Sequence, residues 1–224
     1  MLGYGIDFLG SDFEAIEKNV EDQSFRASLE RLSATQALGF CHVTKKDMWA
    51  LSKDSYFKGS WTGEMFAEAL LAMPKYADHP LLKPYRPGGE RSDNPYVNFY
   101  WDYYSQGKPC YVKIDFPAME EIIDVIHRNH GVAVMAHPGM NLKGKEFLLE
   151  DILKLGIDGI EAFSSYHSPK QAEYFYRTAQ ERNIFATCGS DYHGKTKPAI
   201  GIGQHGCPAA PLQMAQQLSK YFFS

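Results

Sequence analysis

The sequence has no run of about 18 consecutive apolar residues, the length at which a segment reads as a membrane-spanning helix. Its first residues hold no basic stretch followed by an apolar one, so they do not resemble a signal peptide. No Cys-x-x-Cys pair is present, and the four cysteines are widely spaced, at Cys41, Cys110, Cys188 and Cys207. We therefore expect a cytoplasmic protein with free thiols, no membrane association and no zinc knuckle.

A basic excess is also missing, because 27 acidic residues outnumber 23 Lys and Arg and give a formal net charge of −4. A broad electrostatic contact with nucleic acid needs a basic face, so nucleic acid is not the favoured partner. A small phosphorylated substrate or a nucleic-acid end remains open. No Gly-x-Ser-x-Gly segment suggests a serine nucleophile. The 224 residues, 44% of them hydrophobic, suffice for one large domain or two small ones with a real core.

The most informative segment is GSDYHGK, residues 189–195, which follows the short apolar run 184–188. That run predicts a buried strand, so the Asp-x-His pair lies where the strand ends. In extended backbone, the side chains of Asp191 and His193 point to the same side, since they are two residues apart. A carboxylate and an imidazole are both ligands for divalent metals. The simpler alternative is that Asp191 caps the following turn.

A second segment has the same form, because the strand-like run 131–136 ends at His137. Two strand ends that both present metal-binding side chains predict a metal site at the carboxyl edge of a parallel sheet or barrel. The alternative for His137 is a hydrogen-bonded histidine in the turn before Pro138.

Apolar periodicity divides the chain into a helical first part and an alternating second part. The first part, residues 1–110, reads as a mainly helical insertion, with helices predicted at 11–38, 44–52, 62–73 and 94–105, and a proline-rich loop at 74–95. The second part, residues 111–224, alternates strands at 131–136, 158–163 and 184–189 with helices at 117–129, 146–155, 168–182 and 209–223. Strands separated by helices are typical of parallel βα units, so we predict an α/β fold.

Three blocks in the second part, GVAVMAHPG, GIDGIEAFSSYH and TCGSDYHG, resemble the carboxyl-terminal half of a PHP domain, named for DNA polymerases and histidinol phosphatase. The resemblance covers roughly residues 131–203. It implies the carboxyl-terminal part of a distorted (β/α)7, TIM-like barrel that holds up to three divalent ions, Mn, Zn or Fe, and hydrolyses phosphate esters. It also implies that His137, Asp191 and His193 are metal ligands, each for a different ion.

The chain departs from the family at its start, because family members begin with a His-x-His strand before the Leu-Gly-Tyr segment. This sequence contains no His-x-His, and its first histidine is His42. We interpret it as an amino-terminally truncated PHP sequence. We therefore expect the 224 residues to bind metal weakly, and an uncovered barrel edge to favour a homo-oligomer or low stability.

Four further residues are candidates around the metal site. A strand-end carboxylate at Glu161 could orient a metal-binding histidine, or it could lie in a salt bridge or in solvent. His167 follows the same strand, where it could contact substrate. Arg86, in a glycine-bearing loop with Arg91, and Lys113 could hold phosphate oxygens, the alternative for each being a solvated charge.

The aromatic segment 94–105 suggests either a base-stacking platform or the packed core of a helix, and we favour the core, with Val97, Tyr100 or Trp101, and Tyr104 as its buried stripe. For function, we predict a metal-dependent phosphoesterase in which a metal-activated water attacks a small phosphorylated or nucleotide substrate. One alternative is a non-catalytic remnant that acts as a binding or self-associating module. Another is a PHP-type nuclease that acts on nucleic-acid ends.

Overall fold

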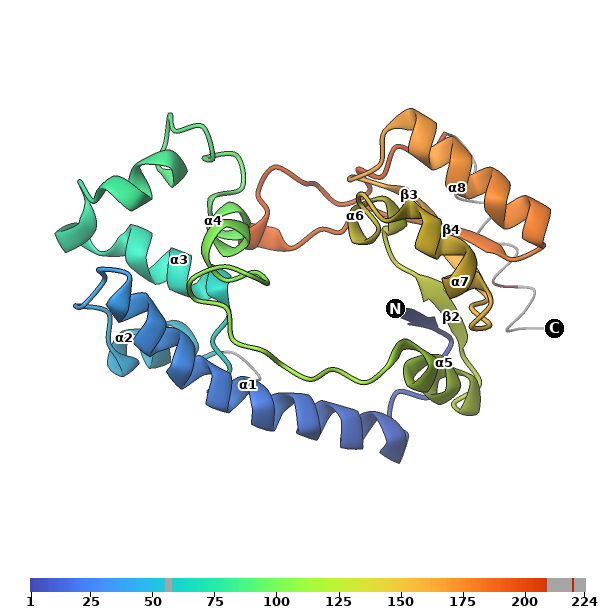
Figure 1. Ribbon diagram of the computed structural model, residues 1–224, viewed down its shortest axis with the longest axis horizontal. Coiled ribbons are helices and arrows are strands. Elements are labelled where there is room, and N and C mark those ends of the chain that lie inside the picture. The colour runs from blue at the N-terminus through green and yellow to red at the C-terminus, as the bar shows by residue number, and fades with distance from the viewer. Residues whose placement is uncertain (55–57, 209–218, 220–224) are drawn as a thin grey trace. The chain divides into compact units, whose positions relative to one another are not determined.

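A four-stranded sheet with the order β1-β2-β3-β4 organises one part of the molecule (Figure 1). The computed structural model describes residues 1–54, 58–208 and 219. The sheet strands are β1 (Leu2–Tyr4), β2 (Val132–Met135), β3 (Gly159–Ser164) and β4 (Phe185–Gly189). β2 and β3 are parallel, as are β3 and β4, which confirms that the three predicted strands are parallel neighbours. β1 pairs antiparallel with β2, with Leu2 opposite Val134.

β2 and β3 form because most of their residues are apolar and both of their faces are covered. Every residue of β2 and β3 is buried, as expected for parallel strands with helices against them. α5 (Met119–Arg128) contributes Ile123 and Ile126 to this core, and α8 (Pro169–Arg182) contributes Phe175 and Ala179.

Local signals define the ends of α8. Ser168 and Gln171 form a capping box at its amino end, and Pro169 occupies the first turn, where its missing N–H costs nothing. Asn183 ends the helix in a left-handed conformation, with φ of 52°.

Short helices follow the other strands. α6 (Pro138–Asn141) begins directly after His137. The helix predicted at 146–155 is present as a 3-10 turn at Glu146–Leu148 that continues into α7 (Leu149–Leu153). The predicted helix 209–223 falls almost entirely outside the described residues.

Residues 15–116 and 193–199 form a second, helical unit, whereas residues 1–14, 117–192 and 200–224 belong to the sheet unit. The helical elements are α1 (Ser11–Ala37), α2 (Lys45–Leu51), α3 (Gly63–Ala72), α4 (Pro95–Tyr103) and the 3-10 helices Pro74–Tyr76 and Pro80–Tyr85. The first turn of α1 lies in the sheet unit. None of the helices in the described part of the chain combines the length and the apolar character that crossing a membrane requires.

The start of the chain does not belong to the helical unit, although the sequence suggested a helical region over 1–110. β1 is held by its pairing with β2, which supplies backbone hydrogen bonds to residues 2–4. The first turn of α1 is also tied to the sheet unit, because Asp12 accepts hydrogen bonds from Arg128 and Asn129 at the end of α5.

The aromatic helix α4 packs into the core of the helical unit, as we favoured. Phe99 is fully buried and lies against Phe40, Tyr85 and Tyr104. The predicted stripe was right for Tyr104, which is buried. Of the two alternatives at its middle position, Tyr100 packs against the core, and Trp101 is 41% exposed. The buried face of α4 is therefore centred on Phe99.

We expect the substitution Phe99→Ala to lower the free energy of unfolding by about 3–5 kcal/mol, because it leaves a cavity among packed rings. The matched change Trp101→Ala should cost clearly less, since that side chain is partly in solvent. Urea denaturation of both variants provides the measurement, and equal losses would contradict this assignment of the buried face.

Candidate functional site

The two predicted ligands that follow β2 and β4 share an unusual backbone conformation. His137 has φ of 28° and Asp191 has φ of 53°, both in the left-handed region that residues other than glycine seldom adopt. Such a conformation costs on the order of 1–3 kcal/mol and persists only where the surrounding structure imposes it. Backbone strain at both strand ends is characteristic of binding and catalytic positions.

Tyr166, in the loop after β3, connects these two side chains. Its hydroxyl donates a hydrogen bond of 2.9 Å to Oδ2 of Asp191. Its ring lies edge-on against the imidazole of His137, with the ring centroids 5.4 Å apart. The structure therefore brings His137 and Asp191 to the same edge of the sheet. Their role as metal ligands remains a prediction.

Glu161 lies on β3 and contacts the chain just after β2 and the last residue of β4. Its Oε2 accepts a hydrogen bond of 2.8 Å from the backbone N–H of His137. Its Oε1 lies so close to Gly189 that a Cβ there would be 2.3 Å away. The side chain is buried, and burial, together with the charge of Asp191, raises the pKa of its carboxyl group, while the His137 N–H opposes this rise. Glu161 thus positions the backbone of His137.

His167 is held by backbone groups on both sides of its ring. The register of β3 against β4 shifts between Glu161 and Phe163, so Ala162 is an extra residue in a bulge. The Nδ1–H of His167 donates to the carbonyl oxygen of Ala162, at 2.8 Å. Its Nε2 accepts the backbone N–H of Gly139 in α6, at 3.0 Å.

These two bonds select one neutral tautomer, because a carbonyl only accepts and an N–H only donates. Burial is the main cause that lowers the pKa of the His167 imidazole, which favours the same neutral form. His167 therefore joins the loop after β3 to the helix after His137. Its contact with substrate remains a prediction.

His193 lies in a different setting from His137 and Asp191. It precedes the 3-10 helix Gly194–Thr196 and belongs to the helical unit. There it lines an open cleft of ≈ 380 Å³ together with Glu64, Glu68 and Lys195, the last two forming an ion pair. Its role as the third metal ligand remains a prediction.

The two predicted phosphate-binding cations also belong to the helical unit. The guanidinium of Arg86 donates to the carbonyl oxygens of Leu71 and Tyr76. Lys113 is exposed and forms an ion pair with Asp115. Arg91 pairs with Asp102. These contacts give each cation a local partner, and phosphate binding by Arg86 and Lys113 stays a prediction.

Glycine at position 189 is required by the nearby carboxylate, so we expect Gly189→Ala to displace Glu161 and break its bond to His137. An unpaired buried N–H costs about 1–3 kcal/mol, and the free energy of unfolding should fall by that amount. Gly201→Ala is the matched control, because a Cβ there meets only the side chain of Gln204, at 3.1 Å. Equal stability of the two variants in urea would argue against a fixed Glu161.

For His167→Ala we expect rapid hydrogen exchange at the amide of Gly139, since that N–H loses its acceptor. Stability should fall by about 1–3 kcal/mol. His42→Ala, an exposed histidine of the helical unit, should leave the Gly139 amide protected. NMR exchange rates measure both, and an unchanged Gly139 rate in His167→Ala would show that the histidine does not hold this turn.

Searches with this sequence find phosphoester-cleaving relatives but no matching family model. A 3′,5′-nucleoside bisphosphate phosphatase of Chromobacterium violaceum is 33% identical over 104 residues, 45% of this chain and 36% of the relative. The 5′-3′ exoribonuclease Rnm of Escherichia coli is 34% identical over 105 residues, 46% of this chain and 36% of the relative. A phosphoribosyl 1,2-cyclic phosphate 1,2-diphosphodiesterase of Eggerthella lenta is 33% identical over 100 residues, 45% of this chain and 37% of the relative. The matched stretches thus span little more than a third of the curated relatives.

Two solved structures share the fold. One, assigned as a metal-dependent phosphoesterase of Bifidobacterium adolescentis, superposes with a TM-score of 0.71 at 22% identity, over 98% of this chain and 70% of that one. The other, an amidohydrolase of Chromobacterium violaceum with bound sulfate and no metal, gives 0.65 at 21% identity, over 96% and 70%. The chain therefore has a mixed α/β fold similar to that of these two proteins.

Proposed function

We propose that this chain carries part of the active site of a PHP-type, metal-dependent phosphoesterase that acts on a small phosphorylated or nucleotide substrate. The observation that carries this proposal is the pair His137 and Asp191, held in left-handed backbone at the ends of two parallel strands and connected by Tyr166. In this proposal the sheet forms the carboxyl-terminal part of a distorted (β/α)7 barrel, whose sites lie at that edge.

The donor set fits divalent metal ions. An imidazole from His137 and a carboxylate from Asp191 are ligands that suit zinc, manganese or iron. Divalent ions held by these residues would supply an activated water near neutral pH and would neutralise charge on a phosphoryl oxygen. The relatives whose names specify a nucleoside bisphosphate, a cyclic phosphate or RNA all cleave phosphate esters, which supports this reaction class.

The remaining residues of the site position these ligands. The Tyr166 hydroxyl orients the Asp191 carboxylate, and the Glu161 carboxylate holds the N–H of His137. His167 fixes the start of α6 against the loop after β3. Hydrogen-bonding partners of this kind maintain the orientation of metal ligands, and their loss typically costs activity about 10–100-fold.

A second candidate is a nuclease that acts on nucleic-acid ends. The similarity to 5′-3′ exoribonucleases favours it, while the net charge of −4 gives no general attraction to RNA. Both candidates use the same metal ligands and differ in the substrate. The substrate assays below separate them.

We expect the chain, supplied with Mn²⁺, to release phosphate only slowly from an aryl phosphate or a nucleoside 3′,5′-bisphosphate, because it binds metal weakly, and Asp191→Asn to abolish this release. Tyr166→Phe keeps the ring and removes the hydroxyl, so it should lower kcat about 10–100-fold. The control Asp151→Asn changes an exposed carboxylate that pairs with Lys154 and should leave the rate unchanged. Phosphate release is measured at saturating metal for all three variants.

Release of mononucleotides from 5′-phosphorylated RNA, without turnover of the small substrates, would select the nuclease. No turnover of any of these substrates by the folded chain would contradict the proposed function and favour a non-catalytic binding module. Equal rates for Asp191→Asn and the unsubstituted chain would show that Asp191 is not a ligand.

A further inference from the structure

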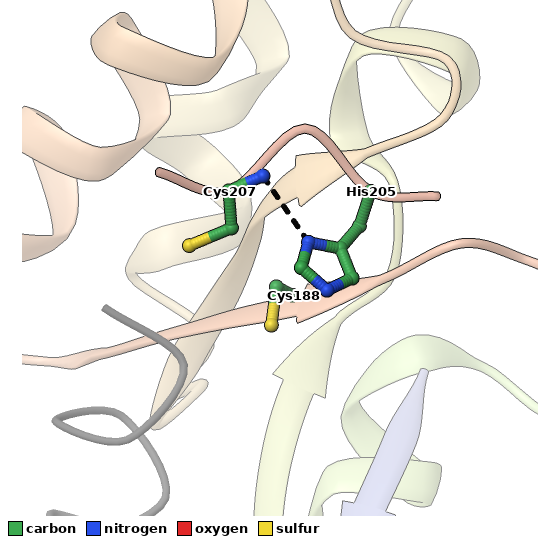
Figure 2. A group of neighbouring side chains, drawn as sticks. All are labelled: Cys188, His205 and Cys207. Atoms are coloured by element: carbon green, nitrogen blue, oxygen red, sulfur yellow. Dashed lines mark hydrogen bonds between the residues drawn. The ribbon is translucent and has the colours of Figure 1, made fainter. Parts of the chain in front are cut away.

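A second group of metal-binding side chains lies on the sheet unit, outside the site described above. Cys188 is on β4, and His205 and Cys207 are on the segment that follows residue 200 (Figure 2). One ligand atom from each residue lies within 4.8 Å of the other two. All three side chains are partly buried. The figure shows the imidazole beside both cysteines.

A tight turn brings His205 and Cys207 together. Gly206 between them has φ of 69°, in the left-handed region open to glycine. The backbone N–H of Cys207 donates to Nδ1 of His205, at 3.1 Å, in the structure without an ion. Zinc binding breaks this bond, because a neutral imidazole has only one nitrogen with a free lone pair, and the ion takes it. The strand β4 then supplies Cys188 as the third donor. Two of the three ligands are thus organised by a local turn before any ion binds.

We propose that Cys188, His205 and Cys207 bind a zinc ion at a site separate from the strand-end site of His137 and Asp191. Two thiolates and one imidazole form a soft donor set that suits zinc, and protein sites with this composition are known to keep a fourth position for water. With Zn–S bonds of ~2.3 Å and Zn–N bonds of ~2.0 Å, tetrahedral ligands are roughly 3.5–3.8 Å apart. Closing the cluster from its present separations thus needs side-chain movements of about an ångström.

Without an ion, the Cys188 thiol keeps its proton, because burial raises its pKa to about 11 and the neighbouring Cys207 adds to the rise. Two thiolates this close repel each other, and a divalent cation between them replaces that repulsion with attraction to both. Binding then displaces the thiol protons.

An ion bound by these three side chains would fasten the segment at residues 205–207 to β4, the strand that leads into Asp191. Of the other two cysteines, Cys41 is exposed and Cys110 is buried in the core of the helical unit, and neither belongs to the cluster.

The test uses the full chain, purified under reducing conditions and loaded with Co²⁺ as a spectroscopic substitute for Zn²⁺. We expect a thiolate-to-cobalt charge-transfer band in the near ultraviolet. Added Zn²⁺ should displace the cobalt and remove this band at about one zinc ion per chain. Cys207→Ala and His205→Gln should each weaken zinc binding at least tenfold. Both positions lie outside the sheet, so these variants should fold. Cys41→Ser is the matched control and should retain the band.

The outcomes separate this proposal from the proposed function. His137→Ala should leave the band intact, because the strand-end site offers imidazole and carboxylate but no thiolate. Absence of the band in the folded, reduced chain would overturn the zinc site. So would a band that persists in both Cys207→Ala and His205→Gln. A Cys188–Cys207 disulfide that forms readily in air, together with no zinc binding after reduction, would instead identify a redox pair.

Discussion

The buried carboxylate of Glu161 is the point at which the three parallel strands are coupled. It projects from β3, accepts the backbone N–H of His137 beyond β2, and fills the space beside Gly189 at the end of β4. Because it is buried and near Asp191, its pKa is raised, and the N–H of His137 is the group that lowers it. A cation at this edge would further favour the ionised form, since bound ions are often the largest local charges in a site. A cation bound at this edge would therefore be linked to the geometry of the strand ends through this one side chain.

The backbone at these strand ends is strained, and the burial of the sheet offsets the cost of this strain. Left-handed conformations at His137 and Asp191 each cost on the order of 1–3 kcal/mol. The burial of β2 and β3 on both faces opposes this cost, as do the bonds made by Tyr166 and His167. The strands thus form a rigid support for His137 and Asp191, whose strained backbone directs polar side chains from the sheet edge. Such an arrangement is common in functional sites.

β4 and the chain that follows it carry two different donor sets. Cys188 lies within the strand, and Asp191 lies just beyond its end. Cys188 lies close to the soft donors His205 and Cys207, whereas Asp191 offers a harder carboxylate oxygen and accepts the hydroxyl of Tyr166. Ligand chemistry alone would direct zinc to the thiolate cluster and allow manganese or iron beside Asp191. A structural ion in the thiolate cluster would restrain the same strand whose end positions the proposed active site.

The amino-acid sequence determined the features that depend on neighbours along the chain. Apolar runs identified β2, β3 and β4, their alternation with helices predicted parallel pairing, and local motifs placed His137 and Asp191 at strand ends.

Tertiary structure decided the rest. β1 has only three residues and no periodicity, so its pairing with β2 was not visible. The rotation of α4, which buries Phe99 and exposes Trp101, is set by the partners that cover it. The bulge at Ala162 decides the contacts of His167. The turn at Gly206 brings Cys207 close to Cys188, although the spacing of these two cysteines in the sequence matches no motif. These contacts join residues distant in the sequence, and they arise only when burial selects which faces of the strands and helices meet.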